Sequence, residues 1–209
     1  MICGVDEAGK GSVIGPMVVA AVGCREISEL EGLPIRDSKV LRPKQRETLY
    51  EDIFRDFSIS IVTIDAAGID EARSRMSMNA CVAELHAEAI MGLQPEYAYV
   101  DACDVNAERY ARTVAGHLNY PCEIIAEHHA DARYKIVGAA SVIAKVTRDR
   151  AIQELEQQYG TIGSGYPSDS ATIEFLRGYI RDRGNPPPCA RRSWKTVANL
   201  CQKTMEDFS

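Results

Sequence analysis

The sequence predicts an α/β protein: a mixed sheet flanked by helices, with a helical extension at the C-terminal end. Three observations predict this class. Short apolar runs typical of buried strands come first, strand and helix patterns then alternate, and only helix patterns remain near the end. The chain has 209 residues and 45% hydrophobic side chains, which is enough for one large domain or for a domain with an appendage.

Five stretches have the apolar character of strands. They cover residues 2–6, 13–23, 58–64, 96–101 and 122–126. The run at 13–23 is apolar on both faces, as in a central strand, although Pro16 limits pairing near its start. Because three strands come early, we expect the sheet to begin with antiparallel pairing.

Five further stretches have helical periodicity. They cover residues 43–57, 70–92, 106–117, 135–158 and 170–183. Pro43 suits the first turn of the first of these helices, and the prolines at 186–188 end the last one.

Composition indicates a cytoplasmic protein. The net charge of −6 and the pI of about 5.3 argue against binding nucleic acid through a bulk positive field. The seven cysteines are odd in number and lack metal-ligand spacing, so we expect reduced thiols. The sequence shows no signal peptide and no apolar run of the ~18 residues that a membrane span needs. Nothing in it demands more than a monomer.

Four acids stand out because of their positions. Asp6 and Glu7 end the first predicted strand, Asp101 ends the fourth, and Asp131 comes just before the long helix. Ligation by carboxylates alone suits hard cations such as Mg²⁺ or Mn²⁺. Two such ions can activate a water molecule and stabilise a leaving oxygen during phosphodiester hydrolysis. The alternative is that acids at strand ends are solvated turn residues.

A glycine-rich turn follows the first acid pair. Residues 4–10 nearly match a phosphate-binding loop, but Gly11 stands where that motif needs serine or threonine, and Asp6 and Glu7 would repel nucleotide phosphates. We therefore reject that motif. Gly9, Lys10 and Gly11 could instead expose backbone groups to a substrate strand, since glycine permits a close approach. A plain tight turn is the alternative.

Basic and aromatic residues supply further candidates. One basic cluster holds Lys39, Arg42, Lys44 and Arg46, and a second holds Lys145, Arg148 and Arg150. Such clusters bind phosphates or are simply solvated helix faces. Ser141, Lys145 and Arg148 share one face of the long helix. Tyr166 lies in a glycine-flanked loop, where it could stack on a sugar or base, or anchor the loop to the core.

Taken together, these motifs resemble those of the ribonuclease HII family (type 2 ribonuclease H) in its archaeal form. The segments that carry the resemblance are residues 4–11 (GVDEAGKG), 37–41 (DSKVL), 99–101 (YVD), 127–134 (EHHADARY), 139–149 (AASVIAKVTRD) and 163–166 (GSGY). Their joint occurrence in this order is highly specific, and the resemblance covers nearly the whole chain.

The resemblance implies a ribonuclease H-like fold over residues 1–200, with a catalytic core at about 1–160 and a helical part at about 161–200. It implies cleavage of RNA in RNA–DNA hybrids and incision 5′ of ribonucleotides embedded in duplex DNA. Products would carry 3′-hydroxyl and 5′-phosphate ends. The family's metal-binding carboxylates fall on Asp6, Glu7, Asp101 and Asp131, which would hold two Mn²⁺ or Mg²⁺ ions when substrate is bound.

The resemblance also implies how the ribose is recognised. Backbone groups of Gly9, Lys10 and Gly11 would read the ribose 2′-hydroxyl, the group that distinguishes RNA from DNA. Many relatives have arginine in place of Lys10, and lysine keeps the charge but not the fork geometry. Tyr166 would stack against the following deoxyribose. Three polar positions near the substrate backbone fall on Lys39, Ser141 and Lys145.

The last residues give a separate signal. Residues 201–209 form a tail in which Gln202, Met205 and Phe208 fit the pattern of the peptide that binds the sliding clamp (PCNA type). Such peptides usually end in two aromatic residues, and here Ser209 replaces the second. The alternative is a helix end whose Met205 and Phe208 pack back on the core.

Two rival functions differ from a divalent-metal ribonuclease. One is another nuclease or transposase on the same fold, which would not depend on the 2′-hydroxyl. The other is a non-catalytic hybrid-binding or clamp-bound adaptor, against which the four intact acids argue. The family reading places the protein in DNA replication and ribonucleotide excision repair.

Overall fold

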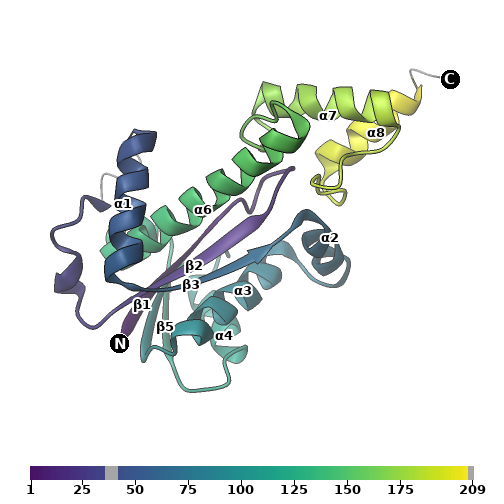
Figure 1. Ribbon diagram of the computed structural model, residues 1–209. Coiled ribbons are helices and arrows are strands. Elements are labelled where there is room, and N and C mark those ends of the chain that lie inside the picture. Colours follow the sequence, from purple (N-terminus) through teal and green to yellow (C-terminus); the bar gives the residue numbers. More distant parts are fainter. Residues whose placement is uncertain (36–41, 207–209) are drawn as a thin grey trace. The chain divides into compact units, whose positions relative to one another are not determined.

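A computed structural model describes residues 1–35 and 42–206, so Lys39 and Phe208 lie outside the described residues (Figure 1). The strands are β1 (Ile2–Ala8), β2 (Met17–Cys24), β3 (Ser58–Ile64), β4 (Tyr97–Asp101) and β5 (Glu123–Glu127). The helices are η1 (Ile27–Leu30), α1 (Pro43–Asp56), α2 (Ala66–Arg75), α3 (Met78–Leu93), α4 (Ala107–Gly116), α5 (Ala130–Arg133), α6 (Lys135–Tyr159), α7 (Ser170–Arg183) and α8 (Lys195–Glu206).

The five strands form one mixed sheet in the order β3-β2-β1-β4-β5. β1 pairs with β2 in antiparallel fashion, which confirms the expected start of the sheet. β1 also pairs with β4, and β4 with β5, and both of these pairings are parallel. The predicted α/β class with a mixed five-stranded sheet is therefore confirmed.

The chain divides into two compact units. Unit 1 holds residues 1–8, 18–62 and 78–147, and unit 2 holds residues 9–17, 63–77 and 148–209. The division falls within the continuous helix α6, between Thr147 and Arg148.

In unit 1, helices lie on both faces of the sheet (Figure 1), and apolar side chains are buried on both faces. On one face, alternate residues of β1 and β2 pack against α1 and the first turns of α6. On the other, Cys3, Val5, Val19 and Ala21 pack against α3 and α4. Because successive strand residues point to opposite faces, β1 contributes apolar residues to both cores. For the same reason, Asp6 and Glu7 at its end point to opposite faces of the sheet.

Unit 2 has its own apolar core. Val13 and Ile14 pack there with Ile162, Leu176 and other residues of the C-terminal helices. Residues 9–17 are held by backbone hydrogen bonds to distant parts of the same unit: the amides of Val13 and Ile14 both donate to the Gly165 carbonyl, at 2.8 and 3.2 Å. This loop is thus integrated with the C-terminal region.

Two predicted elements were wrong in extent. The strand expected at 13–23 begins only at Met17, because Gly15 adopts a left-handed backbone (φ +80°) and Pro16 follows; Ile14 forms only an isolated bridge with Ala190. The helix expected at 70–92 is two helices, α2 and α3, interrupted at Met76, whose backbone is extended. None of the described helices is long and apolar enough to cross a membrane.

Gly4 provides a test of how α6 packs on the sheet. A Cβ atom at Gly4 would lie 2.3 Å from the Ile136 carbonyl carbon and 2.5 Å from the Val137 nitrogen, so Gly4→Ala must push two backbones apart. We expect Gly4→Ala to lower the free energy of unfolding by about 3 kcal/mol or more, measured by denaturant unfolding. The control is Gly116→Ala in the same unit, where an added Cβ meets nothing within 4 Å; we expect it to change stability by less than about 1 kcal/mol. Equal stability of the two variants would contradict this packing.

Candidate active site

Strand register brings the first and third candidate acids to the same end of the sheet. β1 and β4 run parallel with Val5 paired to Val100, so Asp6 and Asp101 are the next residues on neighbouring strands. The backbone amide of Ala130 donates a 2.7 Å hydrogen bond to Asp101 Oδ1. That bond ties the start of α5, which carries Asp131, to the end of β4. The ends of β1 and β4 and the start of α5 therefore lie together in unit 1.

Asp6 is the buried centre of the group, with only 6% of its surface exposed. Burial raises its pKa to about 8, and the charges of Glu7 and Asp101 act in the same direction. A hydrogen bond with Ser141 and another from the Glu7 amide (2.8 Å) oppose the rise. Lys145 Nζ lies 2.7 Å from Ser141 Oγ, so α6 delivers a polar pair to this carboxyl group.

The pKa of Asp101 is also raised, chiefly by burial and further by the charges of Glu7 and Asp131. The charges of neighbouring acids thus disfavour ionisation of both Asp6 and Asp101. Among residues 1–35 and 42–206, however, no three acidic, histidine or cysteine side chains are gathered tightly enough to enclose an ion. An all-carboxylate donor set under mutual repulsion fits a hard divalent cation.

Glu7 has partners that sequence reasoning missed. Its Oε2 lies 3.1 Å from Nε2 of His86 on α3, and His86 Nδ1 lies 3.1 Å from the Tyr110 hydroxyl on α4. His86 is fully buried. The signal available in the sequence was a single imidazole at an otherwise apolar position of a predicted helix, but the partner of such a residue cannot be read from local sequence.

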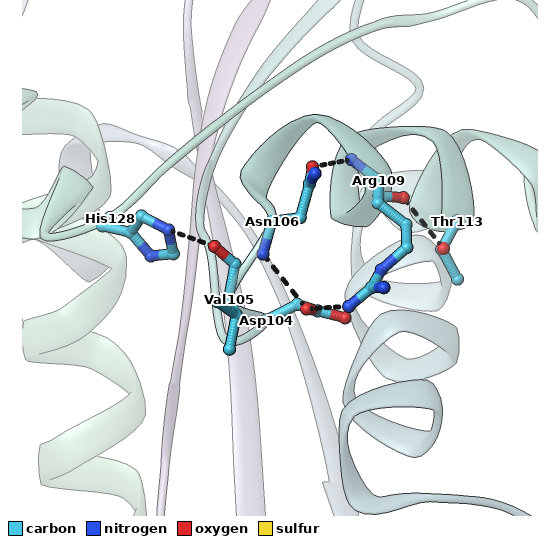
Figure 2. Close-up of polar contacts among 6 residues, drawn as sticks. All are labelled: Asp104, Val105, Asn106, Arg109, Thr113 and His128. Carbon is cyan, nitrogen blue, oxygen red and sulfur yellow. Dashed lines mark hydrogen bonds and ion pairs between the residues drawn. The ribbon is translucent and has the colours of Figure 1, made fainter.

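The loop after β4 is fixed by its own polar contacts (Figure 2). Asp104 accepts hydrogen bonds from the Asn106 amide (3.2 Å) and from the Arg109 guanidinium, and Asn106 caps α4 by accepting from the Arg109 amide (2.8 Å). His128 Nε2 lies 3.2 Å from the Val105 carbonyl oxygen, which can only accept a hydrogen bond. His128, from the segment after β5, therefore ties that segment to the loop that follows Asp101.

In unit 2, a buried arginine holds the glycine turn. Arg191 is fully buried and donates to the Lys10 carbonyl (3.1 Å) and twice to the Gly15 carbonyl (3.2 and 3.1 Å). The N–H and C=O of a trans peptide point in opposite directions, so the Gly11 amide points away from Arg191. Gly11 is exposed, and a Cβ there would meet nothing within 4 Å. Gly9 has a positive φ of +88°, as a tight turn requires. Sequence reasoning missed Arg191.

Tyr166 also belongs to unit 2. Its ring lies against the Arg148 guanidinium, whose carbon is 4.7 Å from the ring centroid, and Arg148 donates a 3.0 Å hydrogen bond to the Ser164 carbonyl. Arg148 is only 3% exposed. The sequence had grouped Arg148 with Lys145 and Arg150 in a basic cluster that could bind phosphates or be solvated. The structure instead buries Arg148 against the loop that carries Tyr166.

At the C-terminal end, α8 continues to Glu206. Gln202 is exposed on this helix and Met205 lies within it, while Phe208 follows the described part of the chain.

Comparison with known proteins decides the family. The family model described as Ribonuclease HII matches residues 3–197. The chain belongs to the ribonuclease HII family. A curated Ribonuclease HII of Methanoregula boonei is 57% identical over 97% of this chain and 95% of its own length. The expected archaeal form of the family is thereby confirmed.

Solved structures of the family support the fold. The ribonuclease H2 of Pyrococcus horikoshii superposes with a TM-score of 0.92 at 41% identity, covering 98% of this chain and 99% of that one. The Archaeoglobus fulgidus ribonuclease HII, solved in a PCNA:RNase HII complex, gives 0.91 at 44% identity and covers both chains fully. Members of the ribonuclease HII family are ribonucleases H that degrade the RNA of RNA–DNA hybrids and need a divalent metal.

The buried acids predict an unusual dependence of stability on pH. The unfolded chain releases the Asp6 proton near pH 4, but the folded protein holds it until about pH 8. With a chelator present, we expect the free energy of unfolding to fall as pH rises through this window, because the folded state binds more protons. Asp101 contributes in the same direction.

Asp6→Asn removes the Asp6 contribution, so its advantage over wild type should grow with pH and reach on the order of 2–4 kcal/mol at pH 8. Urea unfolding of both proteins at pH 5 and pH 8 measures the difference. Parallel stability curves for wild type and Asp6→Asn would show that this carboxyl group titrates normally.

Proposed function

We propose that this protein hydrolyses the RNA strand of RNA–DNA hybrids and incises duplex DNA on the 5′ side of embedded ribonucleotides. The observation that carries the proposal is the buried carboxyl group of Asp6, whose pKa is raised by burial and by the neighbouring acids Glu7 and Asp101. A buried carboxyl group at the end of the central strands, beside two further acids, supports a cation site there, and hydrolysis of a phosphodiester can use such ions.

In this proposal, Asp6, Glu7, Asp101 and Asp131 hold two divalent ions, Mn²⁺ or Mg²⁺, when substrate is bound. The ions would activate the attacking water and offset charge on the phosphate. The water oxygen bonds to phosphorus, the bond from phosphorus to the 3′ oxygen breaks, and that oxygen takes up a proton. The products are a 3′-hydroxyl and a 5′-phosphate. Since Asp6 holds a proton near neutral pH, ion binding must displace it.

Recognition of the ribose falls to unit 2. The 2′-hydroxyl would hydrogen-bond with the exposed amide of Gly11 and with backbone groups of Gly9 and Lys10. Arg191 holds this turn in place by donating a hydrogen bond to the Lys10 carbonyl. Tyr166 would stack on the following deoxyribose, and its contact with Arg148 orients the ring for this role. A second 2′-hydroxyl at that place would clash with the ring, which would select an RNA-to-DNA junction.

Three further polar residues complete the proposed substrate contacts. Lys145 and Ser141 form a bonded pair beside Asp6, and we propose that Lys145 also neutralises backbone phosphate charge. Lys39 would act similarly, although it lies outside the described residues.

The C-terminal residues 201–209, beyond the proposed catalytic domain of residues 1–200, would bind a sliding clamp. The sequence pattern of Gln202, Met205 and Phe208 supports this, as does the A. fulgidus relative solved as a PCNA:RNase HII complex. The helical conformation of residues 201–206 is compatible with a peptide that docks as a short turn followed by an aromatic anchor.

A duplex with one embedded ribonucleotide tests the proposed activity. We expect metal-dependent incision on its 5′ side and no cleavage of the matched all-DNA duplex, because only the first offers a 2′-hydroxyl to the glycine turn. Product ends are identified by gel mobility and by ligation. Asp101→Asn should lower the rate by at least about 100-fold, since it removes one carboxylate from the ion site.

Equal cutting of both duplexes would contradict 2′-hydroxyl recognition and favour a different nuclease. Full activity of Asp101→Asn would contradict the assigned metal ligands.

The clamp proposal is tested by binding rather than activity. We expect Phe208→Ala to weaken binding to an archaeal PCNA by about 10-fold or more, as for loss of an aromatic anchor, measured by calorimetry. Activity on a short duplex without clamp should not change. Unchanged clamp affinity of Phe208→Ala would show that the tail does not dock in this way.

A further inference from the structure

A row of buried polar groups connects Glu7 to helices α3 and α4. It runs from the Tyr110 hydroxyl through the imidazole of His86 to the Glu7 carboxylate, with both separations at 3.1 Å. The His86 and Tyr110 rings meet edge to face, with centroids 5.8 Å apart. His86 is fully buried and Tyr110 is 1% exposed, among the apolar residues of that core.

The chemistry of the groups fixes the direction of the hydrogen bonds. An ionised carboxylate only accepts, so Nε2 of His86 must carry a proton and donate to Glu7. In the neutral imidazole, Nδ1 then accepts, and the Tyr110 hydroxyl donates to it. Burial raises the pKa of Tyr110, so the hydroxyl keeps its proton. The Tyr110 hydroxyl also hydrogen-bonds with Cys103, whereas Nδ1 of the buried His86 relies on Tyr110 for its partner.

Of the three hydrogen-bonded residues, Glu7 is the one whose side chain is not fully buried. The Glu7 side chain is 11% exposed, at the end of β1 beside the other acids. A glutamate has three rotatable side-chain bonds, and ordering them on binding an ion costs affinity. A carboxylate that is already held by a buried donor has lost much of that freedom before the ion arrives.

We propose that His86, oriented by Tyr110, is a positioning residue that holds Glu7 ready to bind a divalent ion. The proposal rests on Glu7 being a metal ligand, as in the proposed function. His86 and Tyr110 touch neither the ion nor the substrate in this scheme. Loss of such an outer partner typically weakens metal binding by about 10-fold to 100-fold.

The test measures Mn²⁺ binding to the full chain without nucleic acid, by calorimetry or by the electron paramagnetic resonance signal of free Mn²⁺. His86→Leu removes both hydrogen bonds, and Tyr110→Phe removes only the hydroxyl that orients the ring. His86→Gln keeps a donor and an acceptor on one side chain. The control is Ile90→Val, one helical turn from His86 in the same core, which perturbs packing without touching the row of buried polar groups.

We expect His86→Leu and Tyr110→Phe to bind Mn²⁺ at least about 10-fold more weakly than wild type. His86→Gln should recover part of the loss, and Ile90→Val should match wild type. Nitrogen-15 spectra of the imidazole should show the proton on Nε2 of His86 in wild type, and the Nδ1 signal should shift in Tyr110→Phe, where no hydroxyl donates to it. A purely structural role would lower stability without these changes.

Wild-type Mn²⁺ affinity in both His86→Leu and Tyr110→Phe overturns the proposal. Where His86→Leu does not fold, Tyr110→Phe alone decides in the same way. Asp101→Asn distinguishes the proposed metal site from the proposed positioning role of His86. If Asp101→Asn loses Mn²⁺ binding while Tyr110→Phe keeps it, the metal site is supported and the positioning role is contradicted. If wild type itself binds no Mn²⁺, the proposed metal site fails, and the role of His86 with it.

Discussion

The close approach of α6 to β1 at Gly4 sets the geometry of the candidate active site. Gly4 and Asp6 point to the same face, about 6.6 Å apart along the strand, and Val137 and Ser141 are about 6 Å apart along the helix. Backbone contact between Gly4 and Val137 therefore places Ser141 beside Asp6, where a hydrogen bond is seen. A side chain at residue 4 would separate the two elements and remove Ser141 from the carboxyl group.

The strand that carries Asp6 and Glu7 directs their side chains to different surroundings, although the charge of Glu7 still raises the Asp6 pKa. Asp6 faces α6, whose Ser141 moderates the effect of burial on the Asp6 pKa and also accepts a hydrogen bond from Lys145. Glu7 meets an imidazole that α3 provides. Adjacent acids in one strand thus draw on separate hydrogen-bonding systems, and both remain next to Asp101. The two-faced sheet is what makes such a pair tolerable in a largely buried position.

Much of this arrangement follows from local sequence patterns, and the rest depends on distant partners. Short apolar runs and helical spacing predicted the five strands and most helices, and acids at strand ends indicated the candidate site. The interruption at Met76 and the late start of β2 escaped prediction because apolar spacing continues through both. Burial of Arg148, Arg191 and His86 depends on what packs around them in three dimensions, and no spacing rule conveys it. A polar residue in an apolar pattern is an incomplete signal until its partner is known.

The buried guanidinium of Arg191 makes the glycine turn dependent on the far end of the chain. The carbonyls that it bonds precede it by 181 residues at Lys10 and 176 at Gly15. During synthesis the turn is made well before residue 191, so it has no Arg191 guanidinium to bond until the intervening residues have been made. It belongs to the same compact unit as the C-terminal helices, whereas β1, which ends at the residue before it, belongs to the other. The hydrogen bonds from Arg191 can therefore form only after the 181 residues that follow Lys10 have been made.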